Sequence, residues 1–305
     1  MLTLTFDDGL KSVIQHGFPL LQKHHVPAVV GVISRRVESG DPDFLNIDDL
    51  KVLAQAGFEI ASHGTNHIRP IEAPLTYTAE PLNAVRDSQN TMLWRASYFY
   101  PILTDIVQDN HVLSRVQAFS NLKAQAGSYF FDVSIGRIVI HPYPGERKFR
   151  AMSYEREMAQ SKMHLEKYGF HISSYIVPYN YWTRKTRDLS LSMYSNVAVG
   201  GNRANYKHDA DRHALKRFVV HSDHSLQKLS GIIEKDAIQN DGWVIFCLHG
   251  VGDSVGWEPI SSQTLDALLT WVHQHQVDVV TLQEGSERLF GKHLNVVAIQ
   301  HESES

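Results

Sequence analysis

Short apolar runs alternate with segments of helical spacing through most of this 305-residue chain. The runs typical of strands are 3–6, 28–33, 58–61, 172–177, 243–248 and 277–282, and helical spacing is found over 10–24, 48–56, 154–168 and 264–275. This alternation predicts β/α units with parallel strands. The carboxyl ends of such strands meet at one face, where barrels of this class carry their chemistry.

Two neighbouring acids follow the first of these strands. Asp7 and Asp8 precede Gly9, and desolvating both negative charges is costly unless a cation or a proton neutralises them. His63 and His67 follow the run 58–61 and, being four residues apart, can converge. A carboxylate and two neutral imidazoles suit Zn²⁺ and leave one position open for water or substrate. The pattern predicts a metal centre, although Asp-Asp-Gly by itself is more often a turn.

Four short segments resemble, in order, the motifs of the NodB-type polysaccharide deacetylases, carbohydrate esterase family 4. They are TFDDG at 5–9, SHGTNH at 62–67, VPYN at 177–180 and CLHG at 247–250. The resemblance implies an α/β fold, the incomplete, distorted (β/α) barrel of that family, here with an inserted segment. It also implies a carbohydrate substrate and a divalent metal, Zn²⁺ first, with Co²⁺ or another divalent ion as alternatives.

The resemblance assigns roles residue by residue. Metal binding is implied for Asp8, His63 and His67. Asp7 is then the general base and His249 the general acid, and the backbone N–H of Tyr179 donates to the developing oxyanion. A preorganised donor of that kind typically contributes about 3 to 4 kcal/mol to the transition state.

Four residues are candidates for contact with the sugar: Pro178, Tyr179, Trp182 and Trp257. The two tryptophans follow strand ends and can act as stacking platforms for sugar rings. The alternative for either tryptophan is a place in the core, because large aromatic side chains are mainly buried.

Two departures from the family pattern need replacements. The third motif usually begins with an arginine that orients the base, and Ile176 stands there instead. Arg217, just ahead of the run 218–220, is the candidate for this role, with Arg184 and Arg69 behind it. The fourth motif, an acid that tunes the catalytic histidine, has no clear match. Its stand-ins are Asp209, Asp211 and Asp223, and none is assigned.

Residues 71–150 interrupt the β/α alternation. We predict one catalytic domain over 1–300, with 71–150 as an insertion and 301–305 as a disordered tail. The aromatic cluster at 98–100 and the alternating run 129–140 predict a helix or two and a β-hairpin. Inserted loops at an active face commonly set specificity, so the insertion is expected to cap or extend the substrate groove. A packing or dimerisation element is the alternative.

Composition limits the remaining possibilities. The chain is 43% hydrophobic and 20% charged, enough for a sizeable core, and its net charge of −4 offers no basic stripe for nucleic acid. The single Cys247 excludes an internal disulfide and is expected to be a buried structural thiol. No long apolar run or signal peptide is seen, so we expect no membrane span and a cytoplasmic location, with a removed export signal as the alternative.

The sequence therefore predicts a metal-dependent N-deacetylase. Its substrate is expected to be the acetamido group of an N-acetylated amino sugar in a polysaccharide, an oligosaccharide or a glycan precursor. One alternative is an amidohydrolase for a small amide, such as a cyclic ureide or a formamido sugar. The other is a noncatalytic carbohydrate-binding relative. Nothing in the sequence predicts the oligomeric state.

Overall fold

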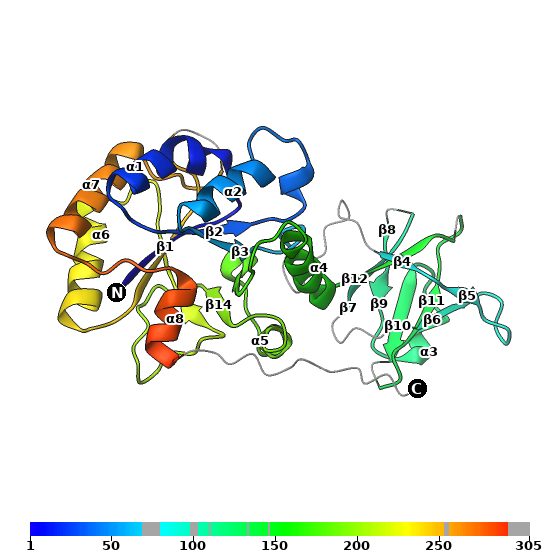
Figure 1. Ribbon diagram of the computed structural model, residues 1–305. Helices are drawn as coiled ribbons and strands as arrows, with labels where there is room; N and C mark the ends of the chain where they lie inside the picture. Colours follow the sequence, from blue (N-terminus) through cyan, green and yellow to red (C-terminus); the bar gives the residue numbers. More distant parts are fainter. Residues whose placement is uncertain are drawn as a thin grey trace, which may run out of the picture.

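The computed structural model describes residues 1–68, 80–97, 103–109, 111–132, 134–145, 147–252 and 256–291. Eight parallel strands form one curved sheet (Figure 1). They are β1 (Leu2–Phe6), β2 (Val29–Val32), β3 (Glu59–Ser62), β13 (Ser174–Ile176), β14 (Asn196–Val199), β15 (Leu215–Lys216), β16 (Phe218–Val219) and β17 (Val244–Leu248).

The order of these strands nearly closes the sheet into a barrel. It runs β15-β14-β13-β3-β2-β1-β17-β16, so β15 and β16 are the two edges. In the chain these edge strands are separated by Arg217 alone, which brings the two edges of the sheet together. The predicted incomplete (β/α) barrel is confirmed.

Strand register decides which side chains meet at the carboxyl ends. Phe6 of β1 pairs with Leu248 of β17, so Asp7 and His249 leave adjacent strands at equivalent positions. Ser62 of β3 pairs with Val32 of β2 and, on its other side, with Tyr175 of β13. The segments that follow these strands therefore lie at one end of the barrel.

Helices cover the outside of the barrel. They are α1 (Phe18–Lys23), α2 (Ile47–Gln55), α4 (Tyr154–Glu166), α5 (Arg184–Ser190), α6 (Leu226–Ile232), α7 (Ser262–Gln274) and α8 (Leu282–Phe290). In α7 the buried residues Leu265, Leu268, Leu269 and Val272 follow helical spacing and pack on the strands. Burying each of these side chains stabilises the fold by about 1.5 to 3 kcal/mol.

Two predicted elements differ from the structure. The helix expected over 10–24 is a π-helical turn, Val13–Gly17, followed by α1, which has Pro19 in its first turn. The strand expected over 277–282 is a single bridge between Leu2 and Val279. It ends there because the Thr281 side chain accepts a hydrogen bond from the Glu284 N–H and caps α8.

Residues 80–153 form a separate β-module (Figure 1). Its strands are β4 (Glu80–Leu82), β5 (Val85–Arg86), β6 (Trp94–Ser97), β7 (Leu103–Gln108), β8 (His111–Val112), β9 (Ser114–Arg115), β10 (Ser128–Asp132), β11 (Arg137–His141) and β12 (Phe149–Ser153). They form two sheets, ordered β5-β6-β11-β10-β9 and β4-β12-β7-β8. The module has its own buried apolar clusters, which share no residue with those of the barrel.

The module is richer in strands than the sequence indicated. The expected hairpin is present as β10 and β11, whose residues pair from Ser128 with His141 to Asp132 with Arg137. In the described part of the module the only helix is the four-residue α3 (Phe119–Leu122). The aromatic cluster 98–100 and the tail 301–305 lie outside the described residues. Of the helices described, none is long and apolar enough to cross a bilayer.

Candidate active site

Asp8, His63 and His67 converge where β1 and β3 end. The Nε2 atom of each histidine lies 3.3 Å from Oδ1 of Asp8. His63 Nδ1 donates a hydrogen bond to the Ile176 carbonyl at 2.8 Å, which fixes the orientation of the ring. A lone pair on Nε2 repels a carboxylate oxygen, so a proton or a cation has to lie between them. This donor set fits a divalent metal ion.

The backbone around these candidate ligands is unusual. Asp8 and His67 have φ values of 71° and 59°, in the left-handed region that side chains other than glycine rarely adopt. Non-glycine residues in this conformation persist only where surrounding contacts determine them, and they gather at functional sites.

Glu157 of α4 supplies many of those contacts, although the sequence analysis did not single it out. Its buried carboxylate accepts hydrogen bonds from the backbone N–H of Asn66 and, at 2.9 Å, from Asn66 Nδ2. Thr65 Oγ1 donates to the Glu157 backbone carbonyl at 2.8 Å. Burial raises the pKa of Glu157, and the Asn66 donors offset this only in part. The loop between the two histidines is therefore wrapped around one carboxylate.

Arg217 lies against Asp7, the predicted base. Arg217 Nη1 is 2.8 Å from Asp7 Oδ1 and 3.0 Å from Oδ2. The same guanidinium donates to Thr5 Oγ1 at 2.9 Å and to Asn180 Oδ1 at 2.7 Å, and Arg217 is completely buried. Burial acts to raise the pKa of Asp7, but the charges of Arg217 and nearby histidines outweigh it and hold the pKa well below its usual range.

Ile176, at the motif position where the family has arginine, is buried beside Gly31. Among the candidate arginines, Arg184 begins α5, whereas Arg69 lies outside the described residues. The thiol of Cys247, which is buried as expected, is 3.4 Å from Asp7 Oδ2 and donates to it. Asp7, Cys247 and His249 also bring metal-ligand atoms together. Because Arg217 already occupies both oxygens of Asp7, a cation is disfavoured there.

His249 follows β17 and faces an aromatic ring. The ring centroids of His249 and Trp257 are 5.0 Å apart at an interplanar angle of 82°. His249 Nδ1 is buried and has no hydrogen-bond partner within the described residues. Burial lowers the pKa of His249, against the raising effect of Asp7 and Asp8.

No stand-in for the fourth motif contacts His249 in the part of the chain that the structure describes. Asp209 pairs with Arg203 at 2.7 Å, and Asp211 pairs with Arg187 at 2.9 Å. Asp223 is 3.9 Å from His224. An acid that tunes His249 is therefore not found among these three residues.

The predicted substrate-contact residues separate into two groups. Tyr179 is 55% exposed, has a φ of 55°, and places its ring centroid 4.4 Å from that of His67, whereas Pro178 is buried. Trp257 is 52% exposed beside His249. Trp182 instead packs on the barrel core, with its indole N–H donating to the His213 carbonyl at 3.1 Å. Trp182 is partly buried in this position, and its contact with the sugar stays a prediction.

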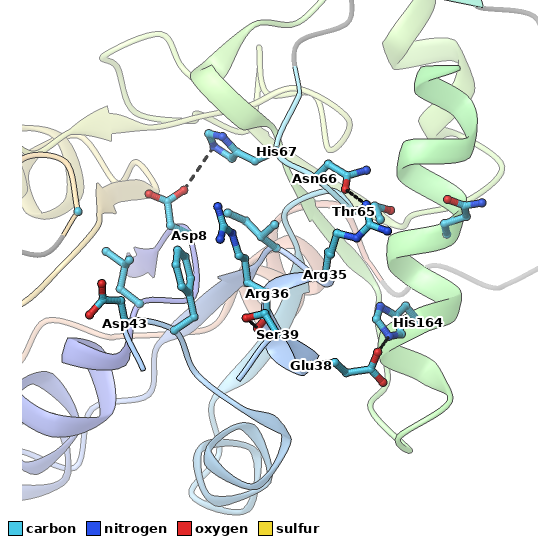
Figure 2. Close-up of a pocket in the computed structure, with 15 residues that line it drawn as sticks. Asp8, Arg35, Arg36, Glu38, Ser39, Asp43, Thr65, Asn66, His67 and His164 are labelled. Atoms are coloured by element: carbon cyan, nitrogen blue, oxygen red, sulfur yellow. Dashed lines mark hydrogen bonds and ion pairs between the residues drawn. The ribbon is translucent and has the colours of Figure 1, made fainter. Parts of the chain in front are cut away.

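A groove of about 1010 Å³ opens beside the metal-ligand cluster (Figure 2). It is lined by Asp8, Leu10, Ile33, Arg35, Arg36, Glu38, Ser39, Asp43, Phe44, Thr65, Asn66, His67, Gln160, His164 and Gly256. These residues come from the barrel, its loops and α4. No described residue of the β-module is among them, and the expectation that the insertion caps or extends the groove stays a prediction.

Residues 1–101 match a family model described as Polysaccharide deacetylase. This part of the chain is similar to the polysaccharide deacetylases. The matched stretch contains the first two motifs, with Asp7, Asp8, His63 and His67. The match supports a hydrolase that acts on carbohydrate. No curated protein matches the chain.

Solved structures similar to this chain include carbohydrate-active enzymes. The Xyl-CE4 domain of a multidomain xylanase from the hindgut metagenome of Trinervitermes trinervoides is 14% identical, with a TM-score of 0.48 over 94% of this chain and 89% of the other. A family 4 acetyl xylan esterase from Clostridium thermocellum, in complex with a cobalt ion, is 14% identical, with a TM-score of 0.47 over 94% and 90%. The Streptococcus pyogenes deacetylase PplD is 16% identical, with a TM-score of 0.46 over 76% and 70%.

Proposed function

We propose that the protein is a metal-dependent N-deacetylase. It hydrolyses the acetamido group of an N-acetylated amino sugar in a polysaccharide, an oligosaccharide or a glycan precursor, and it releases acetate and a free amine. The observation that carries the proposal is the cluster of Asp8, His63 and His67 beside a second carboxylate, Asp7, that Arg217 holds in place. A Zn²⁺ ion, or Co²⁺ in its place, suits this donor set.

Asp7 acts as the general base in this proposal. When bound, a divalent ion supplies a Lewis acid that polarises the amide carbonyl and makes water a better nucleophile. Asp7 is ionised because of Arg217, and it takes the proton of the attacking water. Both Asp7 oxygens are in hydrogen bonds, so the carboxylate needs no reorientation before it accepts that proton.

His249 and Tyr179 complete the proposed machinery. His249 gives a proton to the leaving amine, and the Trp257 ring lies close to its ring in a T-shaped arrangement. Tyr179 offers its backbone N–H to the developing oxyanion, in the left-handed conformation that places it beside His67. Trp257, Tyr179 and Pro178 are proposed to contact the sugar.

The groove favours a saccharide over the alternatives. A cavity of about 1010 Å³ is larger than a small cyclic ureide needs, and its volume offers room for a saccharide. The small-amide amidohydrolase and the noncatalytic carbohydrate-binding relative stay as alternatives. The cytoplasmic location stays a prediction from the sequence.

The test is acetate release from N-acetylated oligosaccharides such as chitotetraose. We expect release that is lost with a chelator, restored by Zn²⁺ or Co²⁺, and lowered about 10²-fold or more in Asp7→Asn. The zinc content of Asp7→Asn, measured by elemental analysis, is the control. Unchanged release from that variant would remove Asp7 as the base. Glycan binding without acetate at any metal supplement would favour the noncatalytic relative.

A further inference from the structure

The groove has a fixed cation close to the metal-ligand loop. The backbone N–H groups of Ser34 and Arg35 donate to the carbonyls of Gly64 and Thr65 at 3.0 and 3.2 Å. Arg36, the next residue, begins a short 3-10 turn, Arg36–Glu38. Its backbone is therefore anchored to the loop that carries His63 and His67. Figure 2 shows the Arg36 side chain extending toward the end of the groove where Asp8 and His67 lie.

The Arg36 side chain is positioned to receive an acceptor. The centre of its guanidinium lies 4.8 Å from the centroid of the Phe44 ring. Stacking uses the face of the guanidinium and leaves its N–H edge for hydrogen bonds. Its contact with Asp41 is long, at 3.5 Å, and both side chains are partly exposed, so this pair contributes little.

The three acids that line the groove, Glu38, Asp8 and Asp43, do not neutralise the charge of Arg36. Glu38 is paired with His164 and with Lys167, both at 2.8 Å. Asp8 belongs to the candidate metal centre. Asp43 lies on the opposite side of the groove from Arg35 (Figure 2). Within the described residues, none of these three acids forms an ion pair with Arg36.

From this arrangement we infer that the substrate carries an anionic group next to the N-acetylated sugar, and that Arg36 binds it. The inference rests on the proposed function and names the substrate class of the same groove. A planar guanidinium with an open edge matches the two oxygens of a carboxylate, as in a uronic acid, or of a phosphate ester. The anionic group is expected beside the Phe44 ring, where the Arg36 guanidinium lies, at the end of the groove near Asp8 and His67.

Three tetrasaccharides with the same N-acetylated sugar test the inference: neutral chitotetraose, a hyaluronan tetrasaccharide that adds carboxylates, and a 6-phosphorylated chitotetraose. We expect kcat/KM to be at least about tenfold higher for one acidic substrate than for the neutral one, and the advantage to fall as salt is raised. The acidic substrate with the higher kcat/KM shows whether the bound group is a carboxylate or a phosphate. In Arg36→Gln the advantage is lost, and the neutral substrate is hydrolysed within about twofold of wild type.

Lys51→Gln is the matched control, since Lys51 is an exposed cation of α2 paired only loosely with Asp48. It is expected to keep the full acidic preference. Equal hydrolysis of neutral and acidic substrates, or an equal loss on all three in Arg36→Gln, would overturn the inference.

Binding without turnover separates this inference from the proposed function. Calorimetry of the three tetrasaccharides on Asp7→Asn is expected to show the same acidic preference, which Arg36→Gln in that background removes. One outcome is that Asp7→Asn binds the acidic substrates preferentially while the wild-type protein releases no acetate from any of them. In that case the anion site is supported and the proposed deacetylase activity is wrong. If acetate is released without any acidic preference in binding, the deacetylase stands and the anion site is wrong.

Discussion

Glu157 is a single buried side chain on which the candidate metal centre depends, although it lies outside that centre. Its carboxylate accepts two hydrogen bonds from Asn66, and its backbone carbonyl accepts one from Thr65. A Cβ at Gly64 would lie 3.0 Å from Glu157 Oε1, and the φ of Gly64 is +80°, so this turn also requires glycine. The spacing of His63 and His67 follows from these contacts.

Replacing Glu157 with glutamine is expected to weaken metal binding. One acceptor becomes an amide donor that faces the Asn66 N–H, so the loop loses its fixed shape. Such supporting contacts are typically worth 10- to 100-fold in metal affinity. We expect a zinc dissociation constant raised about tenfold, measured by competition with a chromophoric chelator. Glu166→Gln, on the same helix and paired with Lys162, should leave it within twofold. Equal affinities for both variants would contradict this role.

Glu157 also predicts a pH dependence of stability. Because burial raises its pKa above the usual 4.5, the folded state holds this proton more tightly than the unfolded state. Stability from this residue is therefore greatest near and below pH 4.5 and is lost as pH rises through the folded-state pKa. Urea unfolding of metal-free protein at a series of pH values should show this slope, and Glu157→Gln should remove it. Identical slopes for both proteins would contradict the prediction.

At the scale of elements, the closure of the barrel depends on the chain between β15 and β16. Arg217 is the one residue between these edge strands, and its buried guanidinium bonds to Asp7 after β1 and to Asn180 after β13. One side chain thus ties together the segments that follow distant strands. The sheet edges and the catalytic end are fixed by the same contacts.

Arg217→Met is expected to destabilise the protein by about 3 to 5 kcal/mol, because it leaves the Asp7 charge buried and unpaired. Chemical denaturation measures the loss. Arg187→Met, which breaks the half-exposed pair with Asp211, should cost no more than about 1 kcal/mol. Adding Asp7→Asn to Arg217→Met should restore part of the stability, since the unpaired charge is then absent. No recovery in the double variant would argue against this pair as the cause.

The sequence predicts the strand ends well, because polar motifs that follow apolar runs meet where parallel strands end. Asp7, Asp8, His63 and His67 converge for this reason. The sequence could not predict the role of Glu157. This residue is a single glutamate in a helix, and its hydrogen-bond partner, Asn66, is 91 residues away in the chain. The last strand was expected because 277–282 is apolar, but the Thr281 cap starts α8 within it. Local hydrogen bonding outweighed the apolar pattern there.

At the scale of the whole molecule, the barrel and the β-module are two bodies with separate cores. The hydrogen bonds from Asn66 to Glu157 bring together the chain before and after the module. We therefore expect that the module can be removed without straining the barrel. The sequence predicted fewer strands over 80–153 than the structure shows. These strands are two to six residues long, and such short strands carry little periodicity.

A variant that lacks 80–153, with 79 joined to 154 through a short glycine-serine linker, is expected to fold. The barrel cluster loses no member, since it resumes at Tyr154. We expect its zinc affinity, measured by calorimetry, to be within about threefold of that of the full chain. We also expect a cooperative thermal transition, measured by circular dichroism. Loss of zinc binding in a folded variant would show that the module supports the metal loop.

The position of Arg217 also has a consequence for inactivation by heat. The Arg217 residue lies between the two edge strands, and its guanidinium also holds the Asp7 carboxylate, the proposed proton acceptor. Separation of the two sheet edges would therefore also release Asp7. Loosening at this seam is thus sufficient to stop turnover while the rest of the molecule keeps its shape. On warming, activity should be lost at a lower temperature than the main unfolding transition. The highest temperature at which the protein works is therefore expected to lie below its melting temperature.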